Sequence, residues 1–80
     1  MTTPDDDTLN RLLGRHISEK RKRLGLTQAA LASLVDVSTS HIGHLEAGDF
    51  GPSVALLVRL SGVLDLNLDR VVALCAAHET

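Results

Sequence analysis

The sequence has almost no aromatic residues and only one cysteine. Phe50 is the single aromatic side chain, and tryptophan and tyrosine are absent. Leucine, isoleucine, valine and alanine must therefore fill the core, which suits a small bundle of helices. Cys75 has no second cysteine to pair with in the chain, so an internal disulfide is excluded and the thiol fits a reducing compartment.

Long apolar runs are also missing. No stretch approaches the roughly 20 residues that span a bilayer, so we expect no membrane segment. The opening residues MTTPDDD are acidic and polar, unlike a secretory signal, which begins basic and then turns apolar. We therefore expect a cytoplasmic protein. With 80 residues, 44% hydrophobic and 22% charged, the composition is that of one small globular domain whose core is marginal alone.

Acidic and basic residues are segregated along the chain. The net charge is −2, but the stretch from Arg11 to Arg23 holds six of the eight lysines and arginines and one acid, Glu19. A basic face can contact an anionic partner even when the protein as a whole is negative. The same stretch would also suit an ordinary solvated helix face, so charge alone leaves DNA binding open.

Apolar residues recur at helical spacing in five segments. We expect residues 1–7 to form a flexible acidic arm and residues 8–78 to form one domain, with helices at about 8–24, 28–35, 39–47, 53–63 and 68–77. The residues expected to face inward in the first two helices are Leu9, Leu12, Leu13, Ile17, Leu24, Leu31, Ala32, Leu34 and Val35. Thr27, Ser38 and Ser53 stand at N-cap positions, and Gly25 ends the first helix. The pattern predicts a compact all-α domain.

The second and third helices are joined by a short turn. Ala32 is small enough to let the two helices approach at a steep angle, and Val37 and Ile42 anchor the junction. This is the arrangement of a helix-turn-helix, whose second helix can lie in the major groove of DNA.

The stretch LTQAALASLVDVSTSHIGHLEAGDFGPS resembles the helix-turn-helix domain of the lambda/434 repressor and Cro type, also called the XRE family. The family pattern runs LTQ-x-x-LA, a turn, VS, then I-x-x-[IL]-E-x-G and P-S. The matching positions are Leu26, Thr27, Gln28, Leu31, Ala32, Val37, Ser38, Ile42, Leu45, Glu46, Gly48, Pro52 and Ser53. The likeness extends over roughly residues 13–74. It implies a compact five-helix, lambda-repressor-like domain that binds DNA.

The resemblance also implies roles for individual residues. Those expected to contact bases are Thr39, Ser40, His41 and His44. Those expected to contact DNA phosphates are Arg21, Thr27, Gln28 and Ser38. Arg21 is further expected to pair with Glu46 and so to orient the recognition helix. Because the base-contacting set has no arginine or glutamine for bidentate contacts, we expect modest sequence discrimination.

Two positions depart from the family pattern. Asp36 stands where many relatives have a turn glycine, and aspartate tolerates the left-handed conformation better than most residues. Asp49 replaces the basic residue that usually follows the glycine of the third helix, and a carboxylate beside a phosphate would weaken binding. The neighbouring Phe50 is expected to lie in the core or to cover part of it, and the alternatives are a contact with a partner and an exposed loop tip.

The C-terminal helix carries more apolar surface than one inward stripe uses, which predicts a homodimer through this helix. The residues of the expected dimer interface are Val71, Val72, Leu74 and Cys75. The alternative is a chain end that packs on the first helix. His41 and His44 share a helix side, but only Glu46 lies near them by sequence and the pattern already uses it, so we expect no metal or other cofactor.

These observations favour a DNA-binding transcriptional regulator, a repressor that binds operator DNA as a homodimer. No nucleophile, base or phosphate loop has the sequence context of an enzyme. One alternative is an antitoxin-like autoregulator whose main partner is another protein. A second is a protein-interaction module that kept the fold and lost its affinity for DNA.

Overall fold

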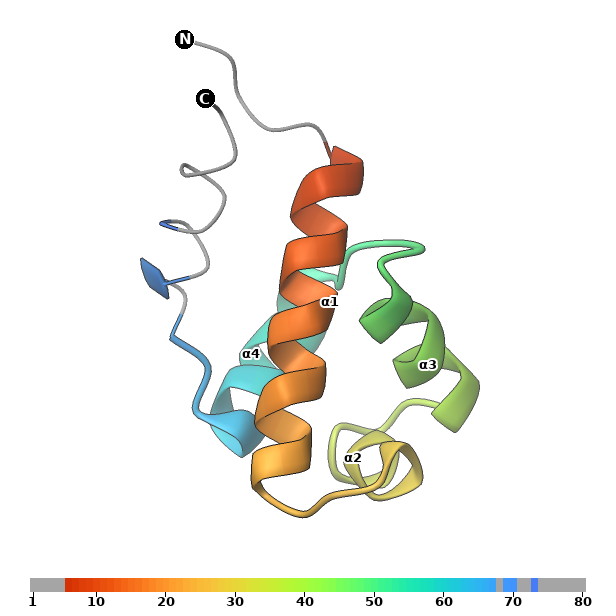
Figure 1. Ribbon diagram of the computed structural model, residues 1–80. Coiled ribbons are helices and arrows are strands. Elements are labelled where there is room, and N and C mark those ends of the chain that lie inside the picture. Colours follow the sequence, from red (N-terminus) through yellow and green to blue (C-terminus); the bar gives the residue numbers. More distant parts are fainter. Residues whose placement is uncertain (1–5, 68, 71–72, 74–80) are drawn as a thin grey trace, which may run out of the picture.

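A computed structural model describes residues 6–67, 69, 70 and 73. Over these residues the chain is all-helical, in the order α1 (Asp6–Arg23), α2 (Gln28–Leu34), α3 (Thr39–Ala47) and α4 (Val54–Leu64). α1 runs through the middle of the molecule and contacts both α3 and α4, while α2 packs against α3 (Figure 1). None of these helices combines the length and the apolar character needed to cross a membrane.

The N-terminal end of the domain differs from the sequence-based expectation, and most of the expected C-terminal helix lies outside the described residues. Asp6 and Asp7, expected in a flexible arm, form the first turn of α1, where their charges suit the positive end of the helix dipole. The expected helix at about 68–77 falls mostly outside the described residues, as do the expected dimer-interface residues Val71, Val72, Leu74 and Cys75. At its expected start, Arg70 N donates to Asn67 Oδ1 at 3.1 Å, the contact an N-cap makes.

One apolar core joins all four helices. The buried hydrophobic residues are Ile17, Leu31, Ala32, Val35, Ile42, Leu45, Leu56, Leu60 and Leu64. The expectation was wrong for Leu24 and Leu34, which are 54% and 58% exposed. Leu24 lies beyond the last residue of α1, and Leu34 ends a helix whose inward side is already taken by Leu31, Ala32 and Val35.

Three of the helices end in the same hydrogen-bonded turn. After α1, Leu26 N donates to Arg21 O and Gly25 N to Lys22 O, the pair of bonds of a Schellman motif. The same pairing follows α2 and α3, with Asp36 and Gly48 in the left-handed position at φ 60° and φ 84°. The prediction that aspartate would serve as the turn residue between α2 and α3 is therefore confirmed.

Replacing Asp36 by glycine is expected to raise the free energy of unfolding by up to about 1 kcal/mol, because glycine carries no penalty in the left-handed region. Gly25→Ala is the reciprocal change, since Gly25 has φ 71° and no atom within 4 Å of where a Cβ would stand. It should lower stability by about 1 kcal/mol. Urea titrations followed by circular dichroism measure both. Equal effects of the same sign would contradict this account of the turns.

α1 and α3 approach each other closely at Gly14. A Cβ built on Gly14 would lie 2.5 Å from the carbonyl oxygen of Leu45 and 2.7 Å from that of Glu46. One turn earlier on α1, the backbone of Arg11 lies against Gly48, where a Cβ would stand 2.8 Å from the Cα of Arg11. The last turn of α3 is thus pressed onto the α1 backbone, which fixes the position of α3.

Candidate nucleic-acid interface

α3 divides its residues between the core and the outside. Ile42 and Leu45 are fully or almost fully buried, whereas Thr39, Ser40 and His44 are exposed and His41 is half-buried. The helix is started by Ser38, whose Oγ accepts a hydrogen bond from His41 N at 3.0 Å. Thr27 caps α2 in the same way, with Oγ1 accepting from Ala30 N at 3.0 Å. The predicted N-caps of both helices are therefore confirmed.

His44 is held by the residue that follows the α3 cap. Its Nδ1 lies 2.7 Å from Asp49 Oδ2, and both side chains are more than half exposed. A carboxylate can only accept, so the proton of this contact resides on Nδ1. In the neutral imidazole the other ring nitrogen, Nε2, is then an acceptor. Asp49 thus has a local partner and favours the tautomer of His44 that carries its proton on Nδ1.

His41 is positioned by the next residue of the same loop. The rings of His41 and Phe50 meet edge to face, with centroids 4.8 Å apart and an angle of 67° between their planes. Phe50 is also packed against the core, which agrees with the expectation that it gives partial cover. The loop after α3 therefore orients both histidines of the helix.

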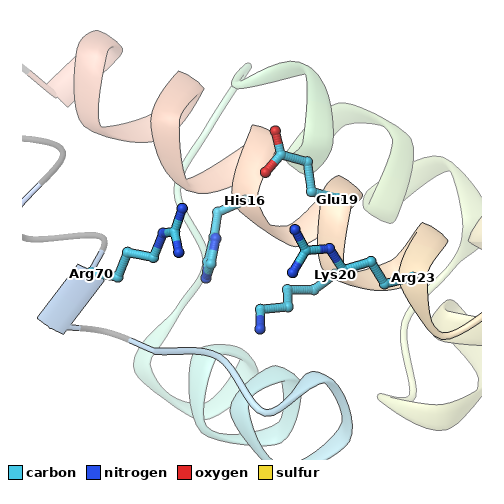
Figure 2. Close-up of a pocket in the computed structure, with 5 residues that line it drawn as sticks. All are labelled: His16, Glu19, Lys20, Arg23 and Arg70. Carbon is cyan, nitrogen blue, oxygen red and sulfur yellow. The ribbon is translucent and has the colours of Figure 1, made fainter.

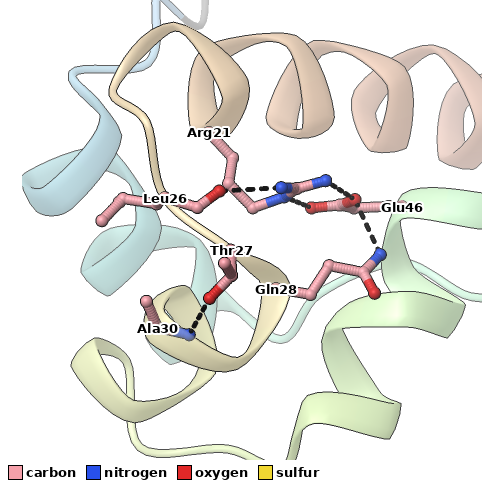
Figure 3. A network of polar contacts seen from close by, with 6 residues as sticks. All are labelled: Arg21, Leu26, Thr27, Gln28, Ala30 and Glu46. Atoms are coloured by element: carbon pink, nitrogen blue, oxygen red, sulfur yellow. Dashed lines mark hydrogen bonds and ion pairs between the residues drawn. The ribbon is translucent and has the colours of Figure 1, made fainter.

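Glu46 joins three helices through one carboxylate (Figure 3). Arg21 Nε on α1 donates to Glu46 Oε2 at 2.7 Å, and Arg21 Nη2 donates to Oε1 at 3.0 Å. Gln28 Nε2, at the first position of α2, donates to the same Oε1 at 3.0 Å. The Arg21 and Glu46 side chains are 10% and 7% exposed, so the pair lies largely out of water.

The ionisation of this network follows from its contacts. Burial on its own would raise the pKa of the Glu46 carboxyl, but the hydrogen bonds from Arg21 and Gln28 outweigh it and hold that pKa below its ordinary value. The hydrogen bond to Glu46 likewise raises the pKa of Arg21, against the effect of burial. Both groups are therefore charged near neutral pH.

Arg21 pairs with Glu46 and has one further partner. Its Nη1 donates to the carbonyl oxygen of Leu26 at 2.8 Å, in addition to the bonds with Glu46. The guanidinium thus joins α1 to α3, and its expected contact with a DNA phosphate stays a prediction. Gln28 is half-buried beside it and keeps one amide N–H that Glu46 does not use.

Sequence reasoning missed three residues of this region. Asp49 and Phe50 were read as a disfavoured charge and as core cover, although each also orients a histidine of α3. Gly14 was not singled out, although a lone glycine inside an apolar helical pattern is a signal of close packing.

Comparison with known proteins agrees with this geometry. The helix-turn-helix family HTH_3 matches residues 17–71. The HTH-type transcriptional regulator YazB of Bacillus subtilis (strain 168) is 34% identical over 58 residues, which cover 72% of this chain and 84% of that protein. The structure of the restriction-modification controller protein C.AhdI from Aeromonas hydrophila aligns with TM-score 0.68 and 28% identity, over 80% of this chain and 96% of that one.

The clp gene regulator ClgR from C. glutamicum aligns with TM-score 0.73 and 26% identity, over 90% of this chain and 94% of that one. Family, relative and solved structures all point to one class of protein, and its members are regulators rather than enzymes. The chain therefore belongs to the HTH_3 family, the XRE type of helix-turn-helix regulators.

Proposed function

We propose that this protein represses transcription by binding operator DNA as a homodimer, with α3 in the major groove. The main support for the proposal is that α3 has one side fixed in the core and another side exposed. Its inner side and last turn are held by the core and by Glu46, while Thr39, Ser40 and His44 remain exposed at its start and one turn on. Two similar proteins are regulators of this kind by description: YazB is an HTH-type transcriptional regulator, and ClgR is the clp gene regulator.

Base recognition is assigned to Thr39, Ser40, His41 and His44. The Asp49 contact makes the neutral His44 present an acceptor at Nε2, which suits the amino groups of adenine or cytosine in the major groove. The protonated ring would instead donate to guanine. Threonine adds a methyl group that can contact the methyl of thymine. None of these contacts is bidentate, so discrimination between operators is modest.

We assign phosphate contacts to Arg21, Thr27, Gln28 and Ser38, the last three of which lie at the N-terminal ends of α2 and α3. Gln28 is the best placed of these, because Glu46 fixes its amide while one N–H stays available. A preoriented donor loses little rotamer freedom when it binds a phosphate oxygen. These contacts set the position of α3 in the groove and carry no sequence information.

The homodimer rests on the apolar residues Val71, Val72, Leu74 and Cys75, which lie outside the described residues. A two-fold dimer would place two copies of α3 about one DNA turn apart, on a palindromic site. Repression by covering a promoter is the simplest action that DNA binding alone supports.

The test is a titration of fluorescently labelled DNA from upstream of the gene, beside a shuffled duplex, at two salt concentrations. Thr39→Ala and His44→Ala should each remove most of the preference for the upstream DNA, which a contact worth roughly 1–3 kcal/mol would supply. Gln28→Ala should weaken binding to both duplexes equally. Asp49→Ala should bind both more tightly and discriminate less, because a negative charge and a fixed tautomer are lost together. The repressor proposal fails if the upstream DNA shows no preference at low salt.

A protein partner is the second candidate, and one observation favours it. Val54 and Val58, one turn apart on α4, are 80% and 66% exposed. Such a pair suits an antitoxin-like autoregulator or an interaction module better than a monomer in water. Val58→Ser would leave DNA binding unchanged under the repressor proposal.

A further inference from the structure

Five charged or titratable side chains surround a small cavity beside α1 (Figure 2). Its lining residues are His16, Glu19, Lys20, Arg23 and Arg70. Four of them come from the second half of α1, and Arg70 approaches from the segment that follows α4. His16, Lys20 and Arg23 recur at helical spacing and so share one side of α1. It is a separate side from that of Gly14 and Arg21, which meet α3.

The imidazole at the base of this cavity is buried without a partner. His16 is 5% exposed, and its Nε2 makes no hydrogen bond. Leaving a buried polar nitrogen unpaired is costly, and native proteins do so rarely outside sites that bind something. Burial, together with the positive charges of Lys20, Arg70 and Arg23, holds the pKa of His16 below its ordinary value, against the opposing effect of Glu19.

The charges around the cavity are unbalanced. Three cations, Lys20, Arg23 and Arg70, face one carboxylate, Glu19, which leaves a surplus of two positive charges when His16 is neutral. No ion pair joins any of these five residues to another within the described part of the chain. A cluster of cations held in this way concentrates a positive potential, which a dianion would neutralise.

We propose that this cavity binds the head of a small dianionic oxyanion, the phosphate group of a phosphate monoester. The cavity has a volume of about 30 Å³, room for one or two oxygen atoms, since one water needs about 10–15 Å³. One phosphate oxygen accepts from His16 Nε2, and the others face the Lys20, Arg23 and Arg70 side chains at the mouth. The remainder of the ester stays in solvent.

Occupancy of the cavity would tie α1 to the segment after α4. Arg70 follows Asn67 closely and precedes the residues assigned to the dimer interface, so a bound phosphate group would steady the approach to that interface. The site lies away from α3, so the anion and the operator would bind together. The proposed anion site does not depend on the proposed DNA binding, and its main measurement is made without DNA.

The first measurement uses inorganic sulfate, whose charge is constant around neutral pH. The resonance of the His16 ring is followed by NMR across pH, in sulfate and in chloride at equal ionic strength, and is assigned by its loss in His16→Gln. A dianion stabilises the imidazolium, so sulfate should raise the pKa of His16. Sulfate should also bind more tightly as the pH falls toward the pKa that His16 has without sulfate, which lies below the ordinary histidine value. An identical titration in both salts would overturn the proposal.

The second measurement compares charge-matched variants by calorimetry with methyl phosphate. Arg23→Ala and Arg70→Ala should each weaken binding about tenfold, the scale of a lost charge-assisted hydrogen bond. Lys22→Ala removes the same charge from the same turn of α1 outside the cavity, and should change affinity by less than about twofold. Equal losses in all three variants would show only a diffuse attraction and reject the site. Displacement of sulfate by duplex DNA would reject a small-molecule site in favour of a DNA contact.

Discussion

Replacing Glu46 by alanine is expected to lower the free energy of unfolding by about 3–5 kcal/mol. The substitution leaves the Arg21 guanidinium in a largely dry position with its partner removed, and takes the acceptor from Gln28 as well. An uncompensated buried charge is among the most destabilising defects a protein can carry. For a domain of 80 residues the loss is about half of the whole stability, which at about 0.1 kcal/mol per residue is roughly 8 kcal/mol. Urea unfolding at neutral pH measures it.

The control is a double variant, which distinguishes the cost of leaving the Arg21 charge unpaired from the contribution of the ion pair itself. In the double variant Arg21→Met, Glu46→Met both charges are gone, and apolar side chains of similar length take their places. We expect it to recover most of the loss, since replacing a whole buried pair is often close to neutral. A Glu46→Ala deficit below about 1 kcal/mol would mean that the pair behaves as an ordinary surface bridge.

Gly14→Ala is expected to destabilise the protein by about 2 kcal/mol. Alanine is the better helix former by about 1 kcal/mol, but its methyl group would stand 2.5 Å from the carbonyl oxygen of Leu45. That oxygen belongs to the backbone and cannot swing aside, so α3 must move off α1. Overpacking of this kind costs about 1–3 kcal/mol or more. DNA affinity should fall too, because the displaced helix carries His44.

Gly62→Ala is the matched control. Gly62 also lies inside a helix, α4, but is exposed and has no atom within 4 Å of where its Cβ would be. The same substitution should therefore stabilise by up to about 1 kcal/mol. Thermal unfolding of the two variants should show shifts of opposite sign. A stabilising Gly14→Ala would mean that the close contact of α1 and α3 does not exist in solution.

The features that could be predicted from the sequence are those governed by neighbours along the chain. Thr27 and Ser38 cap the helices that follow them because a side-chain oxygen reaches an amide three residues on. Asp36 lies between two apolar helical segments, so a turn is expected at this position, and Asp36 adopts the left-handed conformation there. Ile42 and Leu45 follow the helical period into the core.

The features that were missed depend on distance in space. The cavity at His16 exists only because Arg70, far along the chain, is brought beside α1. The contact of His44 with Asp49 is local in sequence, but it depends on the left-handed turn that Gly48 makes between them. Leu34 was expected to face inward because it fits the helical spacing of the apolar residues. In the seven-residue helix α2, however, Leu31 and Ala32 form the buried side and Leu34 is exposed.

Glu46, the close contact at Gly14 and the cap at Gly48 together hold α3 in place, and this affects how such regulators can diversify. All three contacts involve the second half of α3. Thr39 and Ser40 lie in its first turn, are exposed and do not pack in the core. Exchanging those two residues leaves the scaffold intact. Under the proposed base contacts of Thr39 and Ser40, new operators can be acquired by point substitution without loss of the fold, and libraries at these positions are a practical route to regulators of altered target.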